Sequence, residues 1–245
     1  MKSIRTKLSV LFVCSVVLLS LSCGGGGGRS KPTDEFPGIA TLLVTVRAEA
    51  KTGWQDPRKQ SDYAGLRPGE AKSFETTDYS NIDDIIVWVE PQADRYAATA
   101  GNISIDLGDP QQGLRAAGVG SIWDFRNATG KAIDVFLRTE SGKVVPLGLI
   151  PGPGRSLTPD VQGYVEVMAV DQSEPLARVF VAPTAFVRVA TTREPVRFFA
   201  VPPGRAKIIT WHPRLPGTTT EVNVSSNGET RATVTIGVNS LPKVP

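Results

Sequence analysis

A single side chain, His212, could supply an imidazole to a reaction or to a metal. It lies between Trp211 and Pro213 at the end of an apolar segment. A Ser-His-Asp mechanism would have to use this residue, but no serine lies in a Gly-x-Ser-x-Gly sequence. We therefore expect His212 to be a structural residue at a strand end and the protein to have no catalytic residues. A hydrolase of unknown type stays a distant alternative.

Four aspartates are candidates for calcium ligands, because Ca²⁺ is bound by six to eight oxygen atoms. Asp83 and Asp84 are adjacent, but Asp106 and Asp109 lie far from them, and no Asp-x-Asp-x-Asp loop is present. Acidic residues are mostly exposed in proteins, so we expect solvated strand ends here. The sequence predicts no metal site and no other cofactor.

The tryptophans raise the possibility of sugar binding, because aromatic rings can stack on sugars. Trp88 and Trp123 fall within predicted strands and are expected in the core. Trp54 lies in a long polar segment beside Lys51 and Arg58, and it is the tryptophan that we expect to be exposed. A carbohydrate-binding module with Trp54 as its ligand-binding residue is therefore the main alternative function.

Residues 1–22 have the organisation of an export signal. Three basic residues precede an apolar run over residues 8–21, which is too short for a membrane span of about 20 residues. The ending Ser20-Leu21-Ser22-Cys23 resembles the lipobox of bacterial lipoproteins, in which the cysteine is lipidated, although the leucine is one position closer to the cysteine than usual. Cleavage without lipidation is the alternative. The resemblance implies a lipid on Cys23.

Residues 23–37 follow as a glycine-rich tether, with five consecutive glycines at 24–28. Position 24 is not aspartate, and by resemblance to lipoprotein sorting this favours the outer membrane. The expected partners are the membrane, through the lipid on Cys23, and an envelope protein or polysaccharide.

Removal of the signal changes both the charge and the cysteine content. Of 27 basic residues, three lie in the signal, which leaves 24 against 24 acidic ones. A neutral chain lacks the basic excess that neutralises phosphates, so we expect no nucleic-acid partner. Cys14 is removed with the signal, so that Cys23 alone remains and no intrachain disulfide is possible.

From residue 39 onward, short apolar segments of period two alternate with Gly, Pro, Asn-Gly and Ser-Gly turns. This pattern is typical of an all-β protein, and about 13 strands are more than one seven-stranded sandwich needs. The segment 82–90 is apolar on both faces and predicts a central strand. Hairpins are predicted at residues 127–130, at Ser141-Gly142 and at Asn227-Gly228.

The run 198–204, Phe-Phe-Ala-Val-Pro-Pro-Gly, is followed by a strand and by Trp211-His212-Pro213. This arrangement resembles the carboxypeptidase regulatory-like, or transthyretin-like, β-sandwich domain over residues 179–238. One departure is Arg193-Glu194-Pro195, where the family usually has an Asp-Gly turn.

Residues 114–170 resemble a cupredoxin-type sandwich, on Phe125-Arg126-Asn127, Asp134-Val135 and the strand at 163–167. Copper cupredoxins use two histidines and a cysteine. By this resemblance Ile133 stands where the first histidine is expected, and Met168 and Ala169 where the cysteine is expected. The resemblance therefore implies a cupredoxin-like unit without a metal.

The fold class predicted is all-β with two Greek-key β-sandwich units, one transthyretin-like and one cupredoxin-like. Residues 38–96 are expected to complete the C-terminal sandwich of residues 176–245, with the cupredoxin-like unit at 97–175 inserted between them. In the strand before His212, Ala206 and Ile208 face one way while Ile209 and Trp211 face the other. We expect Ile209 and Trp211 to pack against the neighbouring unit, and the whole protein to be a non-enzymatic binding or scaffolding lipoprotein of the envelope.

Overall fold

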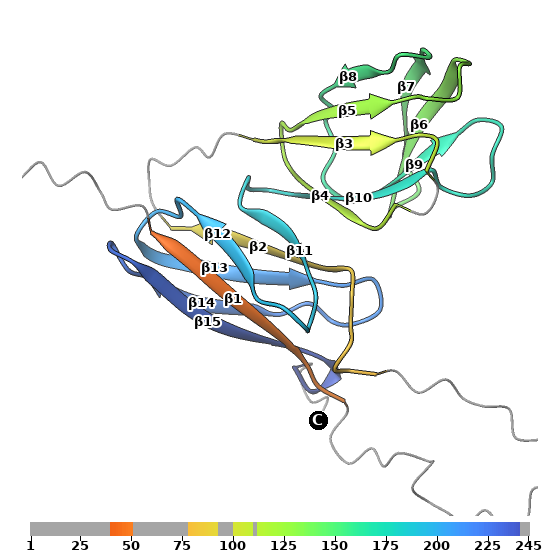
Figure 1. Ribbon diagram of the computed structural model, residues 1–245. Helices are drawn as coiled ribbons and strands as arrows, with labels where there is room; N and C mark the ends of the chain where they lie inside the picture. Colours follow the sequence, from red (N-terminus) through yellow and green to blue (C-terminus); the bar gives the residue numbers. More distant parts are fainter. Residues whose placement is uncertain (1–39, 51–77, 93–99, 110–111, 241–245) are drawn as a thin grey trace, which may run out of the picture. The chain divides into compact units, whose positions relative to one another are not determined.

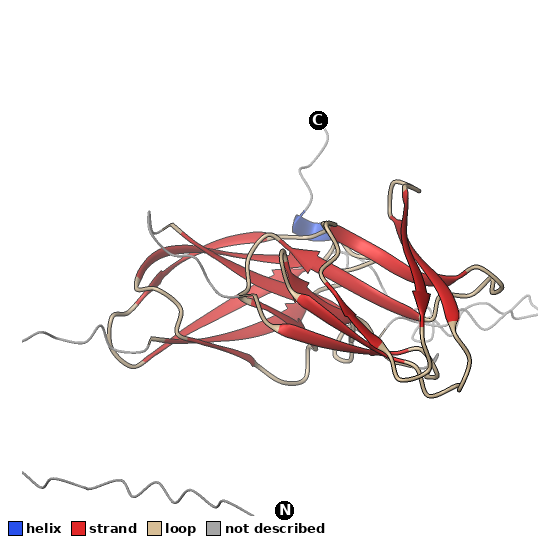
Figure 2. Cartoon of the chain, turned by 90° about the horizontal axis from the view of Figure 1, so that it is seen from above, coloured by secondary structure: helices blue, strands red, loops and turns tan. Residues whose placement is uncertain are grey.

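The computed structural model describes residues 40–50, 78–92, 100–109 and 112–240, and these form an all-β structure (Figure 1). In these ranges the only helix is a single 3-10 turn, shown in blue in Figure 2 beside the red strands. The described residues thus confirm the all-β class, and none of their helices is long and apolar enough to cross a membrane. The elements are β1 (Thr41–Ala48), β2 (Ile85–Pro91), β3 (Asn102–Asp106), β4 (Arg115–Gly118), β5 (Ile122–Arg126), β6 (Ile133–Thr139), β7 (Val144–Ile150), β8 (Arg155–Leu157), β9 (Gly163–Ala169), β10 (Ala177–Ala182), β11 (Val187–Ala190), β12 (Val196–Phe199), β13 (Gly204–Trp211), β14 (Thr219–Val224), β15 (Glu229–Ile236) and η2 (Val238–Ser240).

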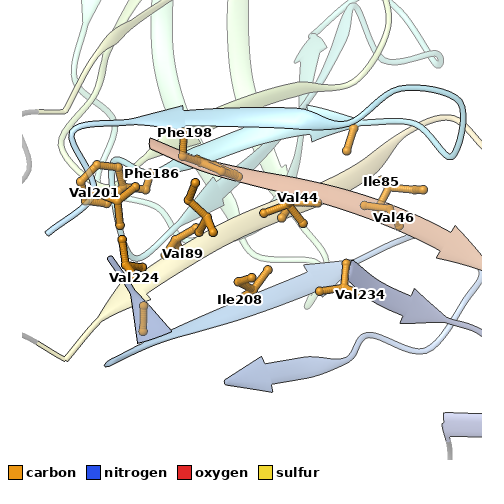
Figure 3. Packing of buried hydrophobic residues seen from close by; sticks show 14 of the residues in the cluster. Val44, Val46, Ile85, Val89, Phe186, Phe198, Val201, Ile208, Val224 and Val234 are labelled. Atoms are coloured by element: carbon orange, nitrogen blue, oxygen red, sulfur yellow. The ribbon is translucent and has the colours of Figure 1, made fainter. Parts of the chain in front are cut away.

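Two of the four sheets share the first hydrophobic core. Their strand orders are β12-β1-β15 and β11-β2-β13-β14, so β1 and β2 lie in sheets with the C-terminal strands. Strand β1 runs parallel to β15 over its whole length and antiparallel to β12. Alternate residues of β1 point inward, and Figure 3 shows Val44 and Val46 of this strand beside Ile85, Ile208 and Val234. We call these two sheets the first sandwich.

The other two sheets enclose a second core. Their orders are β4-β10-β9-β6-β7 and β3-β5-β8, and we call them the second sandwich. Trp123 and Phe125 of β5 pack against inward residues of β6 and β9 such as Leu137 and Val165. Trp123 is 1% exposed, as its expected place in the core requires.

Strand β2 lies between β11 and β13 and is covered on both faces. Ile85, Val87 and Val89 point into the first core. Ile86 and Trp88 point the other way, into a third apolar cluster that also contains Phe180 of β10. The prediction of a central strand with two apolar faces is therefore confirmed.

Two of the three predicted hairpins are wrong, because the strands on either side of the turn do not pair with each other. The strand predicted before residues 127–130 corresponds to β5, which begins at Ile122 and pairs with β3 and β8 instead of β6. The reason is Asn127, which is 2% exposed and donates from Nδ2 to the carbonyls of Lys131 (2.7 Å) and Ile150 (3.0 Å). These bonds hold a connection that passes from one sheet to the other.

The Asn227-Gly228 turn likewise joins strands of different sheets, because β14 pairs with β13 and β15 pairs with β1. Val224 and Val234 both point into the core between those sheets, which separates the two strands. The Ser141-Gly142 hairpin is confirmed: β6 and β7 are antiparallel, and Gly142 has φ of 80°. Glycine adopts this left-handed conformation without steric cost.

Pro183 lies where the chain leaves the second sandwich and enters the first. β10 ends at Ala182 and β11 begins at Val187, and the two strands belong to different sheets. The backbone N–H of Val119 donates to the carbonyl of Ala182 (2.9 Å), and Thr184 Oγ1 donates to the carbonyl of Val89 (2.9 Å). The crossing connection is therefore bonded to both sandwiches.

Candidate functional site

Aromatic side chains gather where the outer face of β2 and β13 meets the outer face of β9 and β10. The Trp211 ring stacks on Tyr164 with centroids 5.4 Å apart and lies 4.8 Å from Phe180. The Trp88 ring centroid lies 5.5 Å from that of Phe180. Such pairs contribute about 0.5–1.5 kcal/mol each beyond the burial of their area. We call Trp88, Tyr164, Phe180 and Trp211 the aromatic seam.

The residues that sequence analysis singled out fall in different places. Trp211 lies in the aromatic seam. Ile209 is half-buried on the same side of β13 and pairs with Trp88 in the ladder, but it is not part of the apolar cluster at the seam. Cys23 and Trp54 lie outside the described residues. Trp123 is buried in the second core as expected, whereas Trp88 is half-buried, with its ring against Phe180.

A polar hollow of about 730 Å³ borders the aromatic seam, and we call it the seam pocket. Five segments contribute to it: the chain before β2, the residue before β4, strand β9, strand β10, and the turn after β13. Its lining residues are Asp78, Asn81, Ile82, Asp83, Asp84, Leu114, Tyr164, Glu166, Arg178, His212, Pro213 and Arg214.

His212 is buried at the wall of the seam pocket and is held on both sides of its ring. The backbone N–H of Arg214 donates to Nδ1 (3.1 Å), and the other ring nitrogen takes part in a hydrogen bond with the backbone of Asp83. Burial lowers the pKa of His212 below 6.5, and the nearby Arg214 lowers it further. Because Nδ1 accepts a hydrogen bond, the ring is neutral with its proton on Nε2.

Tyr164 and Glu166 are the polar residues that β9 contributes. Burial raises the pKa of the Tyr164 phenol, as does the negative charge of Glu166, to which its hydroxyl donates (3.4 Å). Glu166 is itself paired with Arg138 at 2.6 Å. A phenol with a raised pKa stays protonated at neutral pH, so Tyr164 is no nucleophile, and its single O–H is used in the hydrogen bond to Glu166.

The segment before β2 is fixed by hydrogen bonds to the chain after β11. Thr192 Oγ1 accepts from the N–H of Ile82 (2.9 Å) and donates to the carbonyl of Ser80 (2.9 Å). Arg193 forms an ion pair with Asp83 at 2.6 Å. Asp84 has φ of 57°, a left-handed conformation that aspartate tolerates better than most residues. These bonds fix the position of the segment that carries Asp83 and Asp84 at the pocket.

This arrangement provides charged and polar groups for binding. Arg178 and Arg214 are exposed at the pocket, close to exposed Asp84. Within the described ranges no three His, Cys, Asp or Glu side chains come together as metal ligands. The calcium interpretation of Asp83 and Asp84 thus gains no third partner among the residues described.

Glu166 and Arg178 were not predicted to line a pocket. The pattern contains one indication: in β9, Tyr164 and Glu166 alternate with buried Val165 and Val167. Alternation shows that these side chains leave the core, but it does not show which other segment they meet.

Comparison of the chain with protein-family models, with curated proteins and with solved structures found no match. The function must therefore be inferred from the residues themselves. The resemblances to transthyretin-like and cupredoxin-like domains stay predictions from sequence.

Proposed function

We propose that this chain is a non-enzymatic lipoprotein of the cell envelope that binds or scaffolds another envelope component. In this proposal the chain is exported, and a lipid on Cys23 anchors it, with the outer membrane as the destination. The folded strands that begin at β1 then stand on a glycine-rich tether above the membrane surface.

The observation that carries the proposal is the aromatic seam with the polar pocket beside it. Four aromatic rings from two sandwiches pack together, and the hydrogen-bonding groups of His212 are occupied by backbone partners. A neutral imidazole whose acceptor nitrogen is already bonded cannot act as a general base without breaking that bond. The arrangement favours a fixed surface that holds a partner.

Within this proposal, the first sandwich is a carboxypeptidase regulatory-like domain and the second a cupredoxin-like unit without metal. The turn Pro202-Pro203-Gly204 between β12 and β13 supports the first assignment, because proline and glycine there set the conformation of the connection. Because residues 97–175 contain no histidine, the second unit lacks the imidazole ligands of a cupredoxin copper site.

Anchoring is tested by metabolic labelling with a palmitate analogue. The full chain and its Cys14→Ser variant are expected to carry the label, because Cys14 lies inside the signal. Cys23→Ser is expected to lose the label and to leave the membrane fraction. Retention of the label by Cys23→Ser would rule out this anchor.

The scaffolding role is tested with a photo-crosslinking amino acid at Asn81, which is exposed at the seam pocket. The control position is Asn227, which is exposed in the turn between β14 and β15 and does not line that pocket. We expect one envelope component to be captured from Asn81, not from Asn227, and to be lost when Arg178→Glu reverses a charge in the pocket. Equal capture from both positions, or none from Asn81, would contradict the proposal.

A further inference from the structure

Three arginines from three strands border a second hollow of about 660 Å³, which we call the arginine pocket. Arg115 comes from β4, Arg126 from β5 and Arg188 from β11, and all three are exposed. Strands β4 and β11 are edge strands of their sheets, and so is β3, which contributes Asn102 and Ser104 to the same hollow. Three sheets therefore contribute charge or hydrogen-bond donors to one place.

Among the residues that the structure describes, no ion pair neutralises the positive charges of the arginine pocket. Four other arginines are paired with carboxylates, namely Arg138, Arg193, Arg197 and Arg231. Over the described ranges, Arg115, Arg126 and Arg188 have no such ion pair. Arg188 Nη1 donates to the carbonyl of Val187 (2.9 Å), and within the described part of the chain these guanidinium groups form no other hydrogen bond. Most of their N–H donors are thus available to a ligand.

Two aspartates also line the pocket, so the balance of charge depends on where their carboxylates are used. Asp106 Oδ1 accepts the backbone N–H of Gly108 (2.9 Å) and so is engaged within its own turn. Gln112 fixes the same turn, since its side chain donates to the carbonyls of Asp106 (2.6 Å) and Leu176 (3.0 Å). Asp109 belongs to this turn through its backbone bond to Asp106 (3.4 Å). Three arginines and two aspartates give the site a net positive charge. The turn that carries the two aspartates is held by hydrogen bonds.

From this convergence we propose that the arginine pocket binds an oxyanion, a phosphate, sulfate or carboxylate group of a ligand. A guanidinium presents its N–H donors in a planar fork that matches the paired oxygens of these groups. Asn102 and Ser104 add neutral donors for further oxygens, as a hydroxylated ligand would require. The seam pocket differs in charge, because four carboxylates and two arginines line it.

The test is calorimetric titration of the full chain, purified in detergent, with inorganic phosphate and separately with glucuronate. Glucose serves as the neutral control, and potassium chloride of matched ionic strength controls for screening. We expect saturable binding of at least one oxyanion, none of glucose, and an affinity that falls as salt is raised. Phosphate binding alone would identify a phosphate-bearing ligand, and glucuronate binding an acidic sugar; both results support the proposal.

Variants locate the binding. Arg188→Gln is expected to weaken it at least about tenfold, because it removes a charged hydrogen-bond donor. The matched control is Arg205→Gln, which removes the same charge from an exposed arginine of β13 outside the pocket and should leave the affinity unchanged. Equal losses in both variants, or no oxyanion binding beyond the effect of potassium chloride, would overturn the proposal. Partner capture at the seam pocket is a separate result and would stand in either case.

Discussion

His212 joins two chain segments through its two ring nitrogens. Nδ1 accepts the N–H of Arg214 just after β13, and the opposite side of the ring bonds the backbone of Asp83 just before β2. A proton added to Nδ1 would remove that acceptor and place a charge in a buried position next to Arg214. Burial and the positive charge of Arg214 both disfavour the protonated imidazole, and they lower the pKa of His212.

The lowered pKa of His212 predicts that the stability of the protein depends on pH. Because the pKa of His212 is lower in the folded than in the unfolded chain, the unfolded chain binds the additional proton. The free energy of unfolding should therefore decrease as the pH falls below about 6.5, and this decrease should end below the folded pKa. Melting temperatures of the protein and of His212→Asn between pH 8 and 5 measure it, since asparagine keeps an acceptor but does not titrate. Identical pH profiles would contradict the account.

At the scale of elements, the connection between β10 and β11 decides how the two sandwiches are linked. It passes over Gly118 at the end of β4, where an added Cβ would lie 2.7 Å from the Thr184 carbonyl oxygen and 2.9 Å from Ala185 Cα. Both contacts are with backbone, which cannot turn aside as a flexible side chain can. Gly118 is therefore required for this crossing.

We predict that Gly118→Ala lowers the free energy of unfolding by about 1–3 kcal/mol, the usual cost of overpacking. The matched control is Gly113→Ala, where an added Cβ meets no atom within 4 Å. That control should change stability by less than about 1 kcal/mol, because alanine there introduces no contact and restricts the unfolded chain. Urea denaturation of both variants measures the difference. Equal effects of the two substitutions would show that the close approach at Gly118 is unimportant.

Sequence patterns predicted which faces of the strands are apolar, but not which strands pair. Ile86 and Trp88 alternate with Val87, and that alternation was sufficient to predict a central strand. The parallel pairing of β1 with β15 joins residues at opposite ends of the chain, and nothing local to either strand encodes it. Strand β4 was missed because Arg115-Ala116-Ala117-Gly118 has little apolar character of its own.

The two pockets were beyond prediction for the same reason. The pattern identified His212 as a structural residue because it is a lone imidazole between Trp211 and Pro213. Its pocket neighbours Asp83 and Arg178 are distant in sequence and meet it only because the sheets are packed together. The arginines of the second pocket likewise come from three different sheets.

At the scale of the whole described structure, the aromatic seam unites the two sandwiches. Trp211 of the first sandwich touches both Tyr164 and Phe180 of the second, so two of the three ring contacts of the seam depend on it. Truncation of a large buried aromatic residue to alanine lowers the free energy of unfolding by about 3–5 kcal/mol. Trp211 is half-buried, so we expect a smaller loss of about 2–4 kcal/mol for Trp211→Ala. The control Phe199→Ala removes an aromatic ring that is 59% exposed and should cost less than about 1 kcal/mol.

Differential scanning calorimetry of the protein and of Trp211→Ala tests most directly whether the seam makes the two sandwiches one scaffold. The account predicts a single cooperative transition for the unsubstituted protein. For Trp211→Ala it predicts two separated transitions, because each sandwich keeps its own core when the seam is weakened. Two transitions in the unsubstituted protein, or an unchanged single transition in Trp211→Ala, would contradict it.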